Sequence, residues 1–216
     1  MPYKQDSINE LKKTYKSRKS EISERLMHFK AVWDGSDKEI FSELCFCILT
    51  PQSKAVVCDD IINNLKNNCF LFEGSLEQIK PHVKRARFYK NKSKYIVEAR
   101  KCLFKDDKIC IKDKIDAKDT VNSREWLVKN IKGIGYKEAS HFLRNIGMGD
   151  DLAILDIHIL RNLKRLGVIN TMPKSLSKKM YLEIEERLKE FSRQIKIPMA
   201  HLDLLFWSMG TGRIFK

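Results

Sequence analysis

Residues 131–139 read IKGIGYKEA, with a glycine on each side of Ile134 and a lysine two residues after the second glycine. Gly133 and Gly135 can take backbone angles that are closed to other residues and let the chain approach a ligand closely. Between two helices, their N–H groups and the N-terminus of the following helix would form an anion site suited to a phosphate. A plain turn between two helices would show the same glycines, so the choice between a phosphate site and a plain turn depends on the rest of the chain.

The charge of the chain favours a polyanionic partner. Its 216 residues include 42 Lys and Arg against 28 Asp and Glu, a formal net charge of +14. Basic surfaces attract polyanions by steering and by counterion release, so nucleic acid is the first candidate and an anionic membrane surface the second. The N-terminal MPYKQDSINE has no signal-peptide core, and no run approaches the ~18 apolar residues of a membrane span. We therefore expect a soluble, intracellular protein of the cytoplasm or nucleoid.

The six cysteines form no metal-binding pattern. They are Cys45, Cys47, Cys58, Cys69, Cys102 and Cys110. None belongs to a CxxC or to a Cys/His array with the spacing of a metal site. The sequence therefore predicts reduced thiols, no metal site and no iron–sulfur cofactor.

Hydrophobic periodicity is helical nearly everywhere and predicts an all-α fold of roughly ten helices with no evident strand. The expected helices are residues 7–33, 37–49, a helix starting near Ser53, 122–130, 136–146, a run after Asp156, 176–193 and 199–208. Ser53 and Asn122 are expected as N-terminal caps, and Gly147 as the glycine that follows helix 136–146.

Lys137 and Asp156 are the residues whose positions suggest chemistry. Lys137 lies at the start of the helix after the glycines, where the positive end of the helix dipole and partial burial both disfavour the ammonium form. A partly neutral lysine can act as a Schiff-base nucleophile, although a lysine that contacts phosphate would fit the same position. Asp156, in LDIH at 155–158, can cap the following helix and can also stabilise positive charge that develops on a sugar during glycosidic cleavage.

The pair GIGYK at 133–137 and LDIH at 155–158 resembles the helix-hairpin-helix DNA glycosylases that carry a Gly/Pro-rich loop and an essential aspartate. The resemblance implies that Lys137 attacks C1′ of the damaged nucleotide, expels the base and forms an imine that permits β-elimination, which is the AP-lyase activity. It implies that Asp156 assists the lysine and stabilises the charge on the sugar. The loop before Asp156 lacks a proline that some members have.

The resemblance also implies an architecture. Two helical subdomains are expected, one of residues 36–147 with the helix-hairpin-helix, and one of residues 1–35 plus 148–216. The cleft between them would hold Lys137 on one side and Asp156 on the other.

The C-terminal stretch points to a particular base. Trp207 and the final GRIFK resemble the short second class of 8-oxoguanine DNA glycosylases, found largely in archaea and some thermophilic bacteria, which end on a lysine that takes part in base recognition. The resemblance implies base recognition by Lys216, with Trp207 or Phe88 stacking on the base. In TPQSKA at 50–55, Gln52 matches the residue that fills the gap left by a flipped nucleotide, because the glycosidic bond is shielded inside the stack.

We therefore expect a monomeric, bifunctional 8-oxoguanine glycosylase and AP lyase acting on double-stranded DNA that contains 8-oxoguanine or an abasic site. Three alternatives stay open at this point: a glycosylase for oxidised pyrimidines, a non-catalytic helix-hairpin-helix module that holds DNA, and an RNA-associated or ribosome-associated basic protein.

Overall fold

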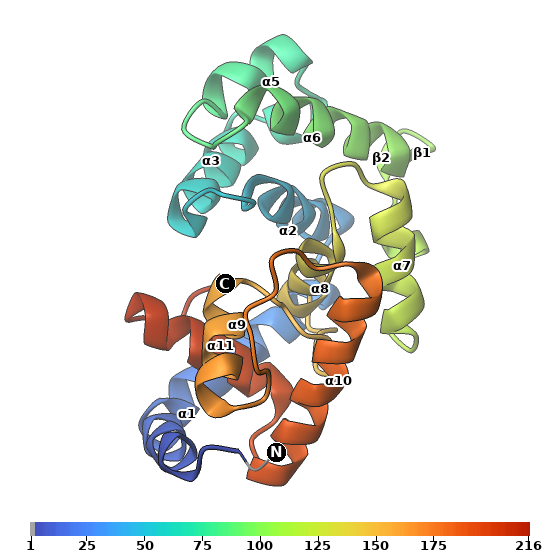
Figure 1. The fold of residues 1–216 in the computed structure, drawn as a ribbon. Helices are drawn as coiled ribbons and strands as arrows, with labels where there is room; N and C mark the ends of the chain where they lie inside the picture. Colours follow the sequence, from blue (N-terminus) through green and yellow to red (C-terminus); the bar gives the residue numbers. More distant parts are fainter. Residues whose placement is uncertain (1–2) are drawn as a thin grey trace.

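The computed structural model describes residues 3–216, and in this part of the chain eleven α-helices account for nearly all regular structure (Figure 1). They are α1 Gln5–Asp34, α2 Asp37–Leu49, α3 Ala55–Asn67, α4 Phe70–Glu73, α5 Leu76–His82, α6 Tyr89–Leu103, α7 Thr120–Asn130, α8 Tyr136–Asn145, α9 Ile157–Leu166, α10 Lys178–Ile195 and α11 Met199–Thr211. A 3-10 helix, η1, covers Lys112–Lys114. The expected all-α class is confirmed. No helix within residues 3–216 has both the length and the apolar character needed to cross a membrane.

A short β-hairpin corrects the expectation that the chain has no strand. β1, Phe104–Lys105, pairs antiparallel with β2, Lys108–Ile109. Asp106 and Asp107 form the two-residue turn, both with positive φ (48° and 59°), as a tight hairpin turn requires. Strands of two residues are too short to show alternating hydrophobicity, so the sequence pattern missed them.

The buried apolar side chains form two clusters. The central cluster comes from residues 40–152, and the terminal cluster from residues 8–29 together with residues 153–214. α1 packs against α9 and α11 near the C-terminus and also against α2 and α8, so it contacts both groups of helices (Figure 1). Packing alone does not show where a subdomain begins, so the boundaries expected at residues 36 and 147 stay a prediction.

Two helix ends near the site lie where the sequence places them. α2 begins with a capping box between Ser36 and Glu39 and ends at Leu49, just before Thr50-Pro51. α8 is followed by Gly147 in the left-handed region, with φ of 78°. A Cβ at this glycine would come within 2.5 Å of the Lys30 backbone in α1, so close helix packing also requires glycine here.

Two expected caps are wrong. Lys54, without a side-chain hydrogen bond, precedes α3, whereas the Ser53 hydroxyl accepts from the Arg87 backbone N–H at 2.9 Å. α7 begins at Thr120, and its cap is Asp119, whose carboxylate accepts from the Asn122 N–H at 2.9 Å. Asp119 thus takes the capping role expected of Asn122, whereas Ser53 bonds a distant backbone group and no side chain caps α3.

Candidate active site

The glycine hairpin links α7 to α8. Gly133 has φ of 83°, and a Cβ there would come within 2.5 Å of the Tyr95 ring, so both backbone angle and space require glycine. Gly135 is extended and directly precedes α8. Its N–H donates to the Glu138 carboxylate at 3.2 Å, which occupies one of the amides expected to face a phosphate.

Lys137 and Asp156 line one cavity of about 860 Å³. Lys137 is the second residue of α8, and its side chain is 24% exposed, with Nζ 3.6 Å from Glu138 Oε1. Asp156 precedes α9 and accepts from the Ile159 N–H at 2.8 Å, as expected for an N-cap. Its second carboxylate oxygen makes no contribution to this cap, so capping leaves one oxygen for a charge in the cavity.

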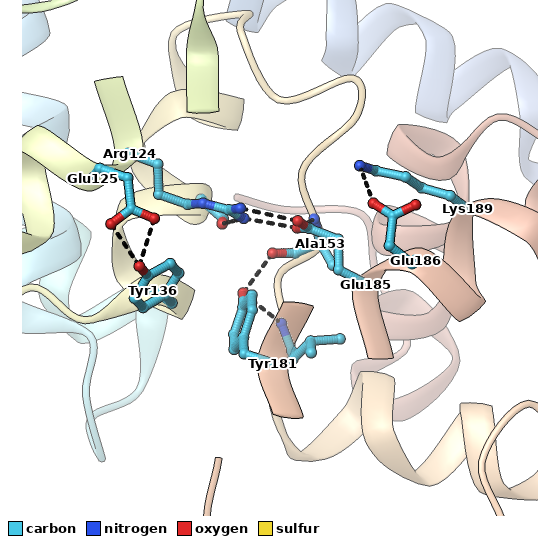
Figure 2. A network of polar contacts seen from close by, with 10 residues as sticks. Arg124, Glu125, Tyr136, Ala153, Tyr181, Glu185, Glu186 and Lys189 are labelled. Atoms are coloured by element: carbon cyan, nitrogen blue, oxygen red, sulfur yellow. Dashed lines mark hydrogen bonds and ion pairs between the residues drawn. The ribbon is translucent and has the colours of Figure 1, made fainter. Parts of the chain in front are cut away.

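The segment that leads to Asp156 is fixed by a buried polar network (Figure 2). Arg124 of α7 pairs with Glu185 of α10 through two bonds of 2.7 and 2.9 Å, and both side chains are almost fully buried. Glu185 also accepts from the Ala153 N–H at 2.7 Å. The Tyr181 hydroxyl donates to the Ala153 carbonyl at 2.6 Å and accepts from the Leu155 N–H at 3.3 Å. The network therefore sets the backbone immediately before the aspartate.

The cavity also collects Gln52, Trp207 and Lys216. Gln52 is exposed in the loop between α2 and α3, and Trp207 of α11 stacks on Phe215 with ring centroids 6.3 Å apart. Five of the eight expected site residues thus line one space, although they come from distant parts of the chain. Gly133 and Gly135 lie outside its lining, in the hairpin before Lys137.

Lys216 is held by its ammonium. Nζ donates to Glu43 at 2.8 Å and to Asp59 at 2.7 Å, and it lies 4.7 Å from the centroid of the Phe46 ring. Burial lowers the pKa of this ammonium, but the two carboxylates outweigh burial, so the pKa of Lys216 is raised. The side chain therefore stays charged and anchored to α2 and α3.

Phe88 is the expected residue that the structure does not bring to the cavity. It directly precedes α6 with φ of 59°, is 53% exposed, and lies 5.0 Å from the Arg87 guanidinium. The cavity lining does not include it. The structure places it at an exposed position before α6, and its role in stacking on the base stays a prediction.

Three further residues of the cavity escaped sequence reasoning: His141, Arg144 and Asp203. His141 is 7% exposed and neither ring nitrogen has a hydrogen-bond partner. Burial, and then the charges of Arg144, Lys137 and Lys216, lower the pKa of His141 well below its usual value. Helical spacing could have identified His141 and Arg144, because residues four and seven positions after Lys137 lie on the same face of the helix.

Asp203 of α11 faces Arg144 of α8, with Oδ2 and Nε 3.4 Å apart. Burial raises the pKa of Asp203 to about 6, although Arg144 opposes the rise. Asp156 adds to the increase because a second carboxylate nearby disfavours ionisation.

A family model described as 8-oxoguanine DNA glycosylase matches residues 22–197. The chain belongs to the 8-oxoguanine DNA glycosylase family. The expectation drawn from GIGYK, LDIH and the C-terminal stretch is confirmed at the level of the family.

Similar members of this family come from bacteria and archaea. An 8-oxoguanine DNA glycosylase/AP lyase of Fusobacterium nucleatum is 50% identical over 215 residues, which cover 99% of each chain. The crystal structure of the 8-oxoguanine DNA glycosylase of Thermotoga maritima has a TM-score of 0.86 at 35% identity and covers 98% of this chain and 99% of that one. The Methanocaldococcus jannaschii glycosylase/lyase, solved with a 15mer DNA containing 8-oxoguanine, has a TM-score of 0.87 at 38% identity and covers 97% and 99%.

Proposed function

We propose that this chain is a bifunctional glycosylase and AP lyase that removes 8-oxoguanine from duplex DNA. The observation that carries the proposal is that Lys137 and Asp156, at the N-terminal ends of different helices, line one cavity of about 860 Å³. Membership of the 8-oxoguanine glycosylase family and the DNA-bound relative from Methanocaldococcus jannaschii support the same conclusion.

The reaction begins with a flipped nucleotide, because C1′ is shielded inside the duplex. The neutral amine of Lys137 attacks C1′, the C1′–N9 bond breaks, and its electron pair leaves with the base, which takes up a proton. The sugar ring then opens as the lysine nitrogen forms an imine with C1′. The imine acidifies the C2′ proton, whose removal expels the 3′ phosphate by β-elimination. Asp156, fixed by the Ile159 N–H, stabilises the positive charge that develops on the sugar.

The remaining expected residues have positions consistent with DNA and base binding. The hairpin glycines Gly133 and Gly135 precede Lys137, so a phosphate held at the N-terminus of α8 would set the sugar near the amine. Gln52 is exposed on a loop of the cavity, where it can fill the gap in the duplex. Trp207 supplies an aromatic face for the base. Lys216 lines the same cavity, where its ammonium pairs with Glu43 of α2 and Asp59 of α3.

We further propose that the protein acts as a monomer in the cytoplasm or nucleoid without a metal or iron–sulfur cofactor. Lysine chemistry of this kind needs no metal. Within residues 3–216, no group of three or more His, Cys, Asp or Glu side chains is arranged to hold a metal ion.

Borohydride trapping tests the proposal. Borohydride reduces the imine to a stable amine, so the wild type should form a covalent complex with duplex DNA containing 8-oxoguanine. Lys137→Gln should lose the complex and at least about 10³-fold of the excision rate, with DNA affinity within a few-fold of wild type. Lys132→Gln is the matched control, because Lys132 is an exposed lysine of the same hairpin, paired with Glu98 at 3.3 Å.

A lesion panel separates the alternatives. Preferred trapping on thymine glycol would instead indicate a glycosylase for oxidised pyrimidines. A lack of trapping on every lesion, with only slightly weaker DNA binding by Lys137→Gln, would indicate a non-catalytic DNA-binding protein. Trapping by Lys137→Gln would remove this lysine from the reaction.

A further inference from the structure

A buried lysine lies under the loop that carries Gln52. Lys92 of α6 is only 4% exposed. Its ammonium donates to the Leu49 carbonyl at 2.6 Å, to the Pro51 carbonyl at 2.6 Å and to the Ser53 hydroxyl at 3.0 Å. An ammonium has three hydrogens, so all its donors are used inside the protein.

The three acceptors belong to one short stretch of chain. Leu49 is the last residue of α2, where carbonyls lack partners within the helix, and Pro51 and Ser53 flank Gln52 in the loop. A positive charge at the C-terminus of a helix is favoured by the helix dipole. Ser53 also accepts from the Arg87 N–H at 2.9 Å, which ties the loop to the turn before α6.

Gln52 needs such support because its backbone is unusual. Its φ is 55°, in the left-handed region that residues other than glycine rarely adopt. A residue in this region keeps its conformation only where the surroundings hold it there. The contacts of Lys92 with Pro51 and Ser53 fix both neighbours of Gln52, while the Gln52 side chain itself stays exposed.

We propose that Lys92 is a positioning residue for base flipping, which holds the loop Pro51–Ser53 so that Gln52 points toward the DNA. The inference rests on the proposed function, in which Gln52 fills the space left by the flipped nucleotide. Lys92 is buried beneath the loop and acts through Gln52 without touching the substrate. Replacement of Lys92 should therefore slow extrusion of a stacked base more than the chemistry at C1′.

A double-mutant cycle tests this coupling. In single-turnover assays on duplex DNA containing 8-oxoguanine, Lys92→Met and Gln52→Ala should each slow excision by about 10–100-fold. The double variant should be about as slow as Lys92→Met alone, because both changes remove the same step. Cleavage of a preformed abasic site, where no stacked base has to leave the duplex, should change by less than about threefold.

Three controls keep the inference separate from folding and from the proposed function. Lys94→Met changes an exposed lysine on the same helix and should leave the ratio of excision to abasic-site cleavage unchanged. Ser53→Ala removes one acceptor of the ammonium with little change in volume and should lower that ratio in the same direction as Lys92→Met. If Lys92→Met does not fold at the assay temperature, the ratio measured for Ser53→Ala tests the inference in its place. Fluorescence of 2-aminopurine beside the lesion should rise more slowly in Lys92→Met and in Ser53→Ala than in the wild type.

Two outcomes would overturn the inference while the wild type still excises 8-oxoguanine. One is a double variant whose loss equals the product of the single losses, which would make Lys92 independent of Gln52. The other is an equal slowing of excision and abasic-site cleavage by Ser53→Ala. Failure of the wild type to excise 8-oxoguanine would instead count against the proposed function itself.

Discussion

Two buried ionic groups of this molecule differ in how completely their polar atoms are paired. The first is the buried network of Arg124, Glu185, Tyr181 and Ala153, called the Arg124 network below (Figure 2). In it Arg124 donates twice to Glu185 and once to Ser140, the last at 3.2 Å. In the cavity, Arg144 and Asp203 are 3.4 Å apart without a hydrogen bond between them, and His141 nearby has no partner for either ring nitrogen.

The difference identifies the Arg124 network as a structural element. Buried polar groups cost free energy when they lack partners, so a protein usually satisfies them. The Arg124 network does so, except at Arg124 Nε, and it holds the chain before Asp156. His141, Arg144 and Asp203, which carry buried atoms without a hydrogen-bond partner, line the cavity instead.

The largest effect on stability is expected from breaking the Arg124 network. Arg124→Met leaves the Glu185 carboxylate buried without its cation and should lower the free energy of unfolding by about 3–5 kcal/mol. Urea unfolding measures this loss. The double variant Arg124→Met with Glu185→Met should recover much of the loss, because no unpaired charge then remains. A loss below about 1 kcal/mol would show that the pairing does not support the fold.

A smaller effect, dependent on pH, is expected at Asp203. Its pKa rises from 3.8 to about 6 on folding, so the folded state holds the proton more tightly than the unfolded state. Its contribution to stability is fully present below pH 3.8 and is lost as pH rises through about 6. Asp203→Asn cannot ionise. Between pH 4 and 7 the variant should therefore gain on the order of 1–3 kcal/mol relative to the wild type, measured by urea unfolding across that range. A difference that stays constant with pH would show that Asp203 is ionised throughout.

The smallest effect is expected at a partly exposed ion pair of the same region. Lys189 lies 2.8 Å from Glu186 on α10 (Figure 2). Lys189→Met should change the free energy of unfolding by less than about 0.5 kcal/mol, because pairs in contact with water contribute little. The same urea assay checks this value beside Arg124→Met. A loss above about 2 kcal/mol would mean that the distance between the charges, rather than their burial, determines how much the pairs Arg124–Glu185 and Lys189–Glu186 stabilise the fold.

Sequence reasoning predicted the features that depend on local spacing. The glycine hairpin, the helix with Lys137 in its first turn and the cap at Asp156 each depend on only a few neighbouring residues, and the structure has all three. Proline and glycine likewise marked the ends of α2 and α8, because backbone sterics act locally.

Features that need distant partners were missed. The contact between Arg144 and Asp203 joins α8 to α11, and the contacts of Lys92 reach back to the end of α2. No pattern of spacing within one helix encodes such meetings. The exposed position of Phe88 was not predictable for the same reason, since an aromatic residue in a basic stretch can face a cavity or solvent, and only tertiary packing decides between them.

The way α1 packs has a consequence for how the protein is made. The central cluster, residues 40–152, is contiguous in sequence, whereas the terminal cluster joins residues 8–29 to residues 153–214. On the ribosome, α1 leaves the exit tunnel first but meets α9 and α11 only after nearly the whole chain has been synthesised. The apolar residues of α1 that belong to the terminal cluster, Ile8, Leu11, Ile22 and Phe29, reach their full burial only then. The packing of α1 is therefore completed late in synthesis, by residues 153–214.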